Sequence, residues 1–233
     1  MGKVSLNDAK AVVSRLVLGL NPKAVLVFGS VARGSSGNDL DLLVIFEENG
    51  KSLQNLDKEI GRNLKNFYEN FGIDYFVVDE NRLKELWRSC SAFLGLILKE
   101  GRIFYMKNAD EIWLKYARED LGMAHSLFKD KYYKGACYHG EQALEKALKG
   151  LLIKQGWELE KTHSIRYLLT IGKRYDLQFD FQEEMINFAE SIYRGRYPEM
   201  EGLLPGGEPS EEETKNLLSS IEDFFRRFRE FKL

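Results

Sequence analysis

VLVFGSVARGSSGNDLDLLVIF, from Val25 to Phe46, is the stretch that decides the fold of the N-terminal half of the chain. It begins with an apolar run of strand-forming residues, which Gly29 ends. Gly29 and Gly34 allow backbone conformations that other residues rarely adopt, so the amide groups of this turn can point toward an anion. A second apolar strand follows the turn, and it carries Asp39 and Asp41.

The two aspartates predict a cation site. Side chains alternate along a strand, so Asp39 and Asp41 project from the same face. Neighbouring carboxylates repel each other, and holding them together costs free energy unless a cation offsets their charge. Oxygen ligands suit magnesium, which also accepts oxygens from a polyphosphate. A Walker-type phosphate loop is excluded, because Ser35 and Ser36 stand where that motif requires Lys and Ser or Thr.

A family resemblance rests on the same turn and strand. Its motif is a Gly-Ser pair, an Ala-Arg-Gly run and Asp-x-Asp on the next strand, here Gly29, Ser30, Ala32, Arg33, Gly34, Asp39 and Asp41. This pattern resembles the DNA polymerase β-like nucleotidyltransferases, and most closely their minimal branch. Asn38 and Leu40 depart from the usual Ser and Ile, but neither change removes a ligand.

The resemblance implies a reaction and a set of site residues. Gly29, Ser30 and Arg33 are expected to bind the phosphates of a nucleoside triphosphate, most simply ATP. Asp39 and Asp41 are expected to hold two magnesium ions. The reaction would move a nucleoside monophosphate, AMP in the case of ATP, to a hydroxyl acceptor.

A third carboxylate is expected from the chemistry, because the attacking hydroxyl must be held and deprotonated. The family carries this residue on a later strand of the same sheet. Asp74, at the start of an apolar strand near residues 73–78, matches that position. Asp79, at the end of the same strand, is the competing candidate.

Composition limits the classes of protein. The 233 residues permit one or two domains, and the formal net charge of -2 gives no strong case for nucleic-acid binding. Cys90 and Cys137 show no zinc-binding spacing and no disulfide framework. No apolar run is long enough to span a bilayer and no signal-peptide core is present, so we expect a cytoplasmic protein.

The periodicity predicts an α+β chain of two domains. Residues 1–108 would form a nucleotidyltransferase domain, a small mixed sheet with helices on one side. A capping box at Ser5 and Asp8 opens its first helix, and a second helix runs from Leu53 to Phe67.

Residues 109–233 would form an all-α, up-and-down helical bundle. A seam of small residues predicts close helix packing: Ala136, Gly140, Ala143, Ala147 and Gly150. Residues 201–209 predict a mobile loop, and a second capping box at Ser210 and Glu213 opens a final helix that reaches Phe231.

The helical half resembles the HEPN family (higher eukaryote and prokaryote nucleotide-binding). The residues that carry this likeness are Ala117-Arg118-Glu119-Asp120, the run from Ala136 to Lys149, Thr162-His163, Tyr193 and Arg196-Tyr197-Pro198. In many bacteria and archaea the two families occur as neighbouring partners, often as toxin and antitoxin. Here they are joined in one chain.

Ribonuclease activity is not expected from the helical half. Many HEPN proteins cut RNA with an Arg and a His that are separated by four to six intervening residues on a late helix, and no late Arg here has such a His. Arg118 and His125 satisfy the spacing, but they lie on the first helix of the bundle, and we interpret that match as chance.

A polar face of the helical half has two interpretations. His139, Gln142 and Lys146 follow one another at helical spacing, and Arg194 and Arg196 lie near the end of a later helix. These residues could form a pocket for a nucleotide or for the acceptor. Equally, His139 could belong to a buried polar network while Lys146 is solvated.

The acceptor is open at the level of sequence. A metal-bearing sheet followed by a helical bundle also resembles kanamycin nucleotidyltransferase, which modifies an antibiotic hydroxyl. Relatives that pair with helical toxins modify a protein tyrosine instead. A non-catalytic nucleotide-binding module derived from a toxin–antitoxin pair is the third alternative. The apolar faces of the bundle predict a homodimer through the helical domain.

Overall fold

The computed structural model describes residues 2–48, 50–194 and 208–228. The chain divides into two compact units, Met1–Lys107 and Asn108–Leu233. The division lies one residue from the expected domain boundary. Each unit is described by itself below.

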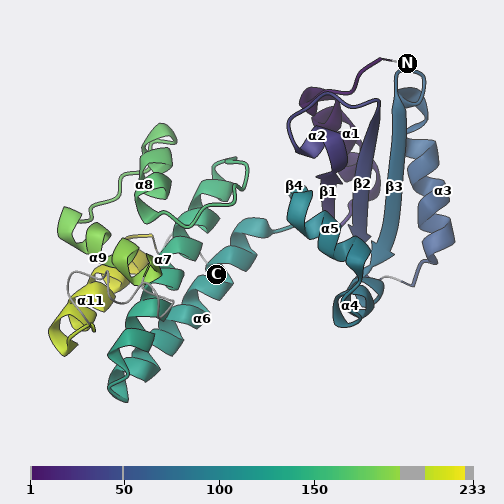
Figure 1. Ribbon diagram of the computed structural model, residues 1–233. Coiled ribbons are helices and arrows are strands. Elements are labelled where there is room, and N and C mark those ends of the chain that lie inside the picture. Colours follow the sequence, from purple (N-terminus) through teal and green to yellow (C-terminus); the bar gives the residue numbers. More distant parts are fainter. Residues whose placement is uncertain (1, 49, 195–207, 229–233) are drawn as a thin grey trace. The chain divides into compact units, whose positions relative to one another are not determined.

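A four-stranded mixed sheet forms the centre of the N-terminal unit (Figure 1). In space the strands follow the order β3-β2-β1-β4, where β1 is antiparallel to both β2 and β4, and β2 is parallel to β3. This arrangement confirms the predicted α+β class. The strands are β1 (Ala24–Phe28), β2 (Asp39–Phe46), β3 (Gly72–Asp79) and β4 (Arg102–Met106).

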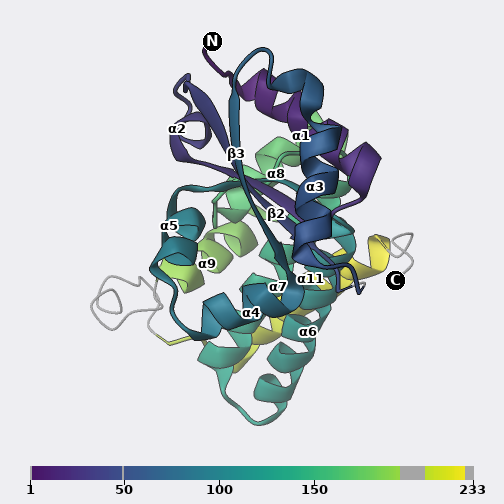
Figure 2. The same cartoon turned by 90° about the vertical axis from the view of Figure 1, so that its right-hand side faces the viewer.

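Helices cover both faces of this sheet, so the expectation of helices on one side only is wrong (Figure 2). Leu42 and Val44 of β2 are buried in one apolar cluster with α1 (Leu6–Leu20) and α3 (Leu53–Asn63). Leu43 and Ile45 are buried on the opposite face with α5 (Ala92–Glu100). The reason is the unbroken apolar run of β2, which needs cover on both sides.

Three short elements complete the unit. The helix α2 (Gly29–Ala32) follows β1 directly, and α4 (Glu80–Arg88) follows β3. A 3-10 helix, Lys65–Phe67, comes after α3. The helix predicted from Leu53 to Phe67 is therefore too long at its C-terminal end, because α3 ends at Asn63.

In the helical unit α7 (Tyr133–Lys154) is the central element, because it packs against α6, α8, α9 and α11. Its buried residues include the predicted seam of small side chains and the larger leucines beside them. The surrounding helices are α6 (Ala109–Lys129), α8 (Ile165–Arg174), α9 (Glu183–Arg194) and α11 (Glu211–Arg227).

Both predicted capping boxes are present. Ser5 and Asp8 cap α1, and Ser210 and Glu213 cap α11 in the same reciprocal manner. Most of the loop predicted at 201–209, and the end of the final helix near Phe231, lie outside the described residues. A search of the described ranges for a membrane-spanning helix finds none.

Candidate active site

The sheet register brings the predicted carboxylates together at one end of the sheet. Asp41 of β2 is paired with Asp74 of β3 on one side and with Phe28 of β1 on the other. Asp39 lies two residues earlier on β2, opposite Gly72, and therefore projects from the same face as Asp41. Alternation places all three acids on the face that α5 also covers.

The backbone of the glycine turn lies directly against Asp41. Gly29 has a φ of 69°, in the left-handed region, and a Cβ added there would overlap the Asp41 carboxylate. A Cβ added at Gly37 would likewise overlap the Ser30 hydroxyl. Two glycines thus let the turn, the serine and the acidic strand pack without side chains between them.

Hydrogen bonds hold the rest of the turn in place. Val4 and Gly37 exchange backbone hydrogen bonds of 2.8 and 3.2 Å, which attach the turn to the segment that leads into α1. The Ser35 hydroxyl donates to the Ser30 carbonyl oxygen at 2.8 Å. The segment before Asp39 is therefore tied down at both of its ends.

The three carboxylates influence one another electrostatically. Partial burial raises the pKa of Asp41, the negative charges of Asp39 and Asp74 raise it further, and the charge of Arg33 opposes them. Carboxylate oxygens are the ligands that magnesium prefers, so the chemistry of this donor set fits that ion. Over the described parts of the chain, no three His, Cys, Asp or Glu side chains are gathered closely enough to hold a metal. Because carboxylates repel each other, a shared cation is what would draw these oxygens together.

Arg33, the third predicted phosphate-binding residue, forms an ion pair with Glu100 at the end of α5. Its side chain is about half exposed. The guanidinium therefore lies at the rim of the acidic site and is already partly neutralised. Phosphate binding by Gly29, Ser30 and Arg33 stays a prediction.

The competing acid, Asp79, has a structural partner elsewhere. Its Oδ1 accepts a hydrogen bond of 2.7 Å from the backbone amide of Arg82, so it caps α4. It is paired with Phe46 at the far end of β3, five residues beyond Asp74. Of the two candidates, only Asp74 lies beside Asp41.

In the helical unit, His139 and Lys146 of α7 converge on Asp120 of α6. Asp120 is 4% exposed, its Oδ1 lies 2.8 Å from Nδ1 of His139, and its Oδ2 pairs with Lys146. Sequence reasoning singled out His139 and Lys146 but missed the acid between them. Its position within the apolar stripe of α6 was the available signal, since a buried acid needs partners.

Two other residues of the predicted helical pocket, Gln142 and Arg194, contact acids other than Asp120. Gln142 donates to Glu141 at 2.8 Å, and Arg194 is exposed, 3.6 Å from Glu190. Arg196 lies outside the described residues. The contacts of His139 match the buried polar network, and ligand binding on this face stays a prediction.

Sequence reasoning also missed a second buried ionic group. Lys149 Nζ donates to Glu145 Oε1 at 2.7 Å and to the Thr162 carbonyl oxygen at 2.6 Å. Nδ1 of His163 lies 3.1 Å from Glu145 Oε2, and its ring stacks on Tyr193 with centroids 4.9 Å apart. The four-residue spacing of an acid and a base amid buried leucines could have indicated this pair.

The remaining histidine bears on ribonuclease activity. Nε2 of His125 lies 2.9 Å from Glu222 of α11, so each of the chain's 3 histidines lies beside a carboxylate. Arg118 is exposed on α6 and, seven residues away, is about two helical turns from His125. A joint role of these two residues has no support from their contacts.

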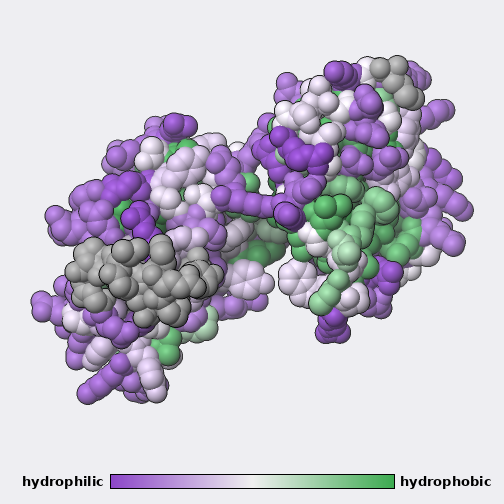
Figure 3. Space-filling view, in the orientation of Figure 1, coloured by the Kyte–Doolittle hydropathy of each residue, from purple (hydrophilic) through white to green (hydrophobic). Residues whose placement is uncertain are grey.

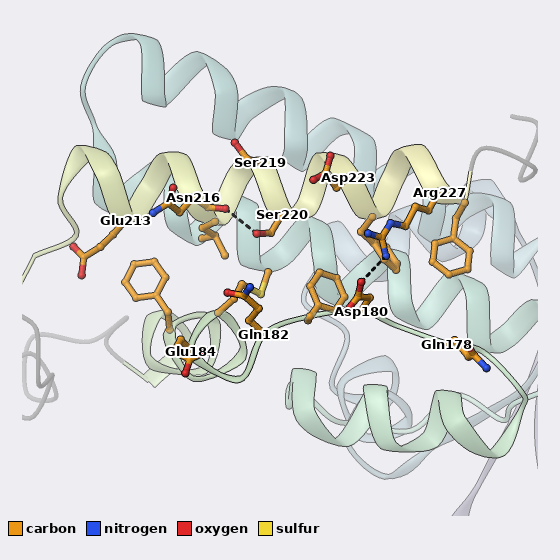
Figure 4. Close-up of a pocket in the computed structure, with 16 residues that line it drawn as sticks. Gln178, Asp180, Gln182, Glu184, Glu213, Asn216, Ser219, Ser220, Asp223 and Arg227 are labelled. Atoms are coloured by element: carbon orange, nitrogen blue, oxygen red, sulfur yellow. Dashed lines mark hydrogen bonds and ion pairs between the residues drawn. The ribbon is translucent and has the colours of Figure 1, made fainter.

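A cavity of about 710 Å³ opens between α9 and α11 (Figure 4). Phenylalanine side chains line it together with Glu184, Glu213 and Asp223. Arg227 bridges to Asp180 at 3.1 Å across one end. This cavity shares no residue with the predicted helical pocket.

The two cysteines are free and differ in accessibility. Cys90 is exposed between α4 and α5, with a φ of 50°. Cys137 is buried in α7 and donates to the Thr214 hydroxyl at 3.3 Å, and burial raises the pKa of its thiol to about 11.

Two family models match this chain, one in each of its two compact units. A model of the HEPN domain matches residues 111–231, and a model of the nucleotidyltransferase domain matches residues 6–89. A protein of Methanocaldococcus jannaschii named "Putative toxin MJ1304" is 25% identical over 131 residues, which is 52% of this chain and 86% of that protein.

Solved structures show partial similarity. An archaeal HEPN homologue, ST0689, is 25% identical and covers 53% of this chain and 97% of its own, with a TM-score of 0.39. TT1696 of Thermus thermophilus is 27% identical and covers 53% and 98%, with a TM-score of 0.41. A nucleotidyltransferase-like protein of Exiguobacterium sibiricum is 12% identical and covers 94% and 73%, with a TM-score of 0.35.

Proposed function

Because the chain belongs to the HEPN family and carries a nucleotidyltransferase domain before its HEPN domain, we propose that it is a magnesium-dependent nucleotidyltransferase. It would move a nucleoside monophosphate, AMP from ATP, to a hydroxyl acceptor. One observation carries this proposal: Asp41 is paired with Asp74 in the sheet. Asp41 also stands two residues after Asp39 and lies against the Gly29 turn.

The turn supplies the phosphate-binding groups. Its backbone amides around Gly29 and the hydroxyl of Ser30 hold the outer phosphates. Since α2 spans four residues, individual amides rather than a long helix dipole provide this binding. Arg33 offsets phosphate charge from the rim, in exchange with its partner Glu100.

The acids have separate roles. Asp39, Asp41 and Asp74 are the residues that would hold magnesium, which when bound offsets the charge of the triphosphate. Asp74 also orients the acceptor hydroxyl and takes its proton. The acceptor oxygen forms a bond to the α-phosphorus, the bond from that phosphorus to the bridging oxygen breaks, and pyrophosphate leaves.

The acceptor is either a protein tyrosine or a small molecule with a free hydroxyl. The name of the Methanocaldococcus relative links part of the chain to toxins, and this supports a protein acceptor of the toxin–antitoxin type. The HEPN half would then bind the acceptor or nucleotide and form a homodimer. Sedimentation of the full chain at micromolar concentration tests the dimer, and a monomer there contradicts it.

The transfer assay uses ATP labelled at the α-phosphate, with magnesium, the full chain and three acceptor classes: protein, RNA and aminoglycoside. We expect label on protein with the wild type and none with Asp41→Asn. Asp74→Asn is expected to lose roughly 10²–10⁴-fold in rate, as for removal of a general base. Equal labelling by wild type and Asp41→Asn would rule out this site.

A non-catalytic nucleotide-binding module is the alternative outcome. It predicts that the wild type binds ATP and magnesium but labels none of the three acceptor classes. A kanamycin-type enzyme predicts label on the aminoglycoside alone. Thin-layer and gel separation of the same reactions distinguishes these results.

A further inference from the structure

An aromatic cluster lies on the same face of the sheet as the acids. It consists of Phe28 of β1, Phe76 of β3 and Phe93 of α5. The ring centroids of Phe76 and Phe93 are 4.6 Å apart, and the Phe28 ring lies 6.2 and 6.3 Å from them. Phe76 is 46% exposed and Phe93 is 36% exposed. The cluster is therefore packed within itself and open to solvent on one side.

The sheet register places this cluster directly beside the carboxylates. Phe28 is the β1 partner of Asp41, so the two lie in one row across the sheet with Asp74. Phe76 follows Asp74 by two residues, which puts it on the same face about 7 Å further along the strand. The row of Asp41 and Asp74 thus carries the charge, and the exposed Phe76 ring lies in the next row on the same face.

Core packing does not account for the exposed rings. The helix α5 has the sequence AFLGLILKE, yet of its apolar side chains only Leu94 and Ile97 are buried. A helix that is apolar on most sides is normally enclosed by protein. Figure 3 shows the resulting hydrophobic surface over α5. Its place next to the acidic row suggests a ligand with a charged end and a flat apolar end.

We propose that the aromatic cluster binds the nucleobase of the nucleoside triphosphate whose phosphates lie at Asp39, Asp41 and the Gly29 turn. This rests on the proposed function and adds where the base lies. A base stacks on phenyl rings through its π face, and Phe76 and Phe93 are the partly exposed rings of the cluster. A ribose spans the one-row distance between the phosphates and these rings.

The cluster also predicts the kind of selectivity. Phenyl rings have no hydrogen-bonding groups, so they cannot read the edge of a base. Stacking strength increases with ring area, which favours purines over pyrimidines without separating adenine from guanine. We therefore expect ATP and GTP to bind with similar affinity, and both to bind more tightly than CTP and UTP.

Equilibrium binding to the full chain with magnesium tests the proposal, using ATP and inorganic tripolyphosphate as probes. Tripolyphosphate carries the charge without the base. We expect the wild type to bind ATP at least about five-fold more tightly than tripolyphosphate, the lower limit for one stacked base. Phe76→Ala and Phe93→Ala should remove that preference and leave tripolyphosphate binding within about two-fold of wild type.

Two further variants separate stacking from folding. Phe76→Leu keeps an apolar side chain of similar size and loses the ring, so it should also lose the preference for ATP. Leu18→Ala removes an exposed apolar side chain from α1, on the opposite face of the sheet, and should change neither affinity. Photo-crosslinking with 8-azido-ATP should label the peptide that contains Phe76 or Phe93.

The outcomes distinguish this proposal from the proposed function. If the wild type binds both probes equally, or if Phe76→Ala weakens both alike, the base lies elsewhere and the phosphate site stands. Crosslinking confined to the helical unit leads to the same conclusion. If the wild type binds neither probe, both proposals fail. Unchanged ATP binding in every Phe variant would contradict the proposed base site. The exposed aromatic surface would then be assigned to a protein partner.

Discussion

The surroundings of Asp41 destabilise its ionised carboxylate. It lies beside Asp74 in the sheet register, two residues from Asp39, and against the backbone of Gly29. Burial and both neighbouring charges raise its pKa. Such sites lower the stability of a fold in exchange for function, so relief of the repulsion should stabilise the protein.

Asp41→Asn should therefore raise the melting temperature of the protein at pH 7 in the absence of magnesium. A gain of about 1 kcal/mol corresponds to roughly 2–4 °C in a chain of this size. The pKa of Asp41 is raised in the fold, so its ionised form destabilises the fold above that pKa. The difference between variant and wild type should shrink as pH falls through it. Thermal melts between pH 7 and pH 4 measure this.

Asp8→Asn is the matched control with the opposite sign. Hydrogen bonds from Ser5 lower the pKa of Asp8, so its ionised form stabilises the fold above the ordinary aspartate pKa. Removal of that charge should lower the melting temperature at pH 7. A fall in both variants would mean that the charge of Asp41 does not destabilise the fold.

Asp79 and Asp74 give contrasting predictions on one strand. Asp79→Ala removes the N-cap of α4 and should cost about 1 kcal/mol of unfolding free energy, with transfer within a few-fold of wild type. Asp74→Asn should keep stability and lose transfer. Urea unfolding and the labelling assay check both variants. Loss of transfer in Asp79→Ala alone would reverse the assignment.

Single residues differ in how far the sequence reveals their surroundings. Alternation along one strand was enough to place Asp39 and Asp41 on one face, and the family resemblance pointed to Asp74 as the third acid. Asp120 could not be paired with His139 and Lys146, because their contact depends on how α6 turns toward α7. The spacing of residues in the sequence does not show which face of α6 packs against α7.

At the scale of elements, the small-residue seam of α7 sets how closely its neighbours approach. A Cβ at Gly150 would lie 2.9 Å from Leu114 Cγ and 3.2 Å from the Asp110 carbonyl oxygen of α6. A Cβ at Gly140 would lie 3.0 Å from Leu218 of α11. The seam thus serves two helices, each at its own glycine.

Gly150→Ala should destabilise the helical unit even though alanine favours helices. The new methyl group meets both a branched carbon and backbone of α6, and overpacking of this kind typically costs about 1–3 kcal/mol, which exceeds the gain in propensity of about 1 kcal/mol. Chemical unfolding monitored by circular dichroism measures the change.

Gly122→Ala is the control on the partner helix. A Cβ at Gly122 meets nothing within 4 Å, so only the gain in helix propensity remains. This variant should be more stable than wild type by about 0.5–1 kcal/mol. Stabilisation by both variants would show that α6 moves away from Gly150 at little cost.

Elements were predicted well where the signal is local. Capping boxes depend on residues three positions apart, and both were confirmed. The end of α3 was missed because apolar spacing continues through the 3-10 turn, which the same periodicity also fits. The cluster of Phe28, Phe76 and Phe93 was missed because it depends on strand register and the position of α5.

For the whole molecule, the apolar clusters define two separate cores. Two clusters belong to the N-terminal unit and one to the helical unit, and no residue is shared between them. Two cores in one chain favour unfolding in more than one step.

Calorimetry of the full chain should therefore show two transitions. Asp41→Asn should move one of them and Gly150→Ala the other, because the two substitutions lie in different compact units. ATP with magnesium should raise the midpoint temperature of the same transition that Asp41→Asn shifts. A single transition shifted by all three changes would show that the units unfold together.

The contrast between the two thiols gives an experimental handle without mutagenesis. Cys137 is enclosed and stays protonated at neutral pH, whereas Cys90 is accessible, so a maleimide dye should mark the folded chain at one position. That position is three residues from Phe93. Fluorescence from the dye could therefore follow nucleotide occupancy in real time on the native sequence.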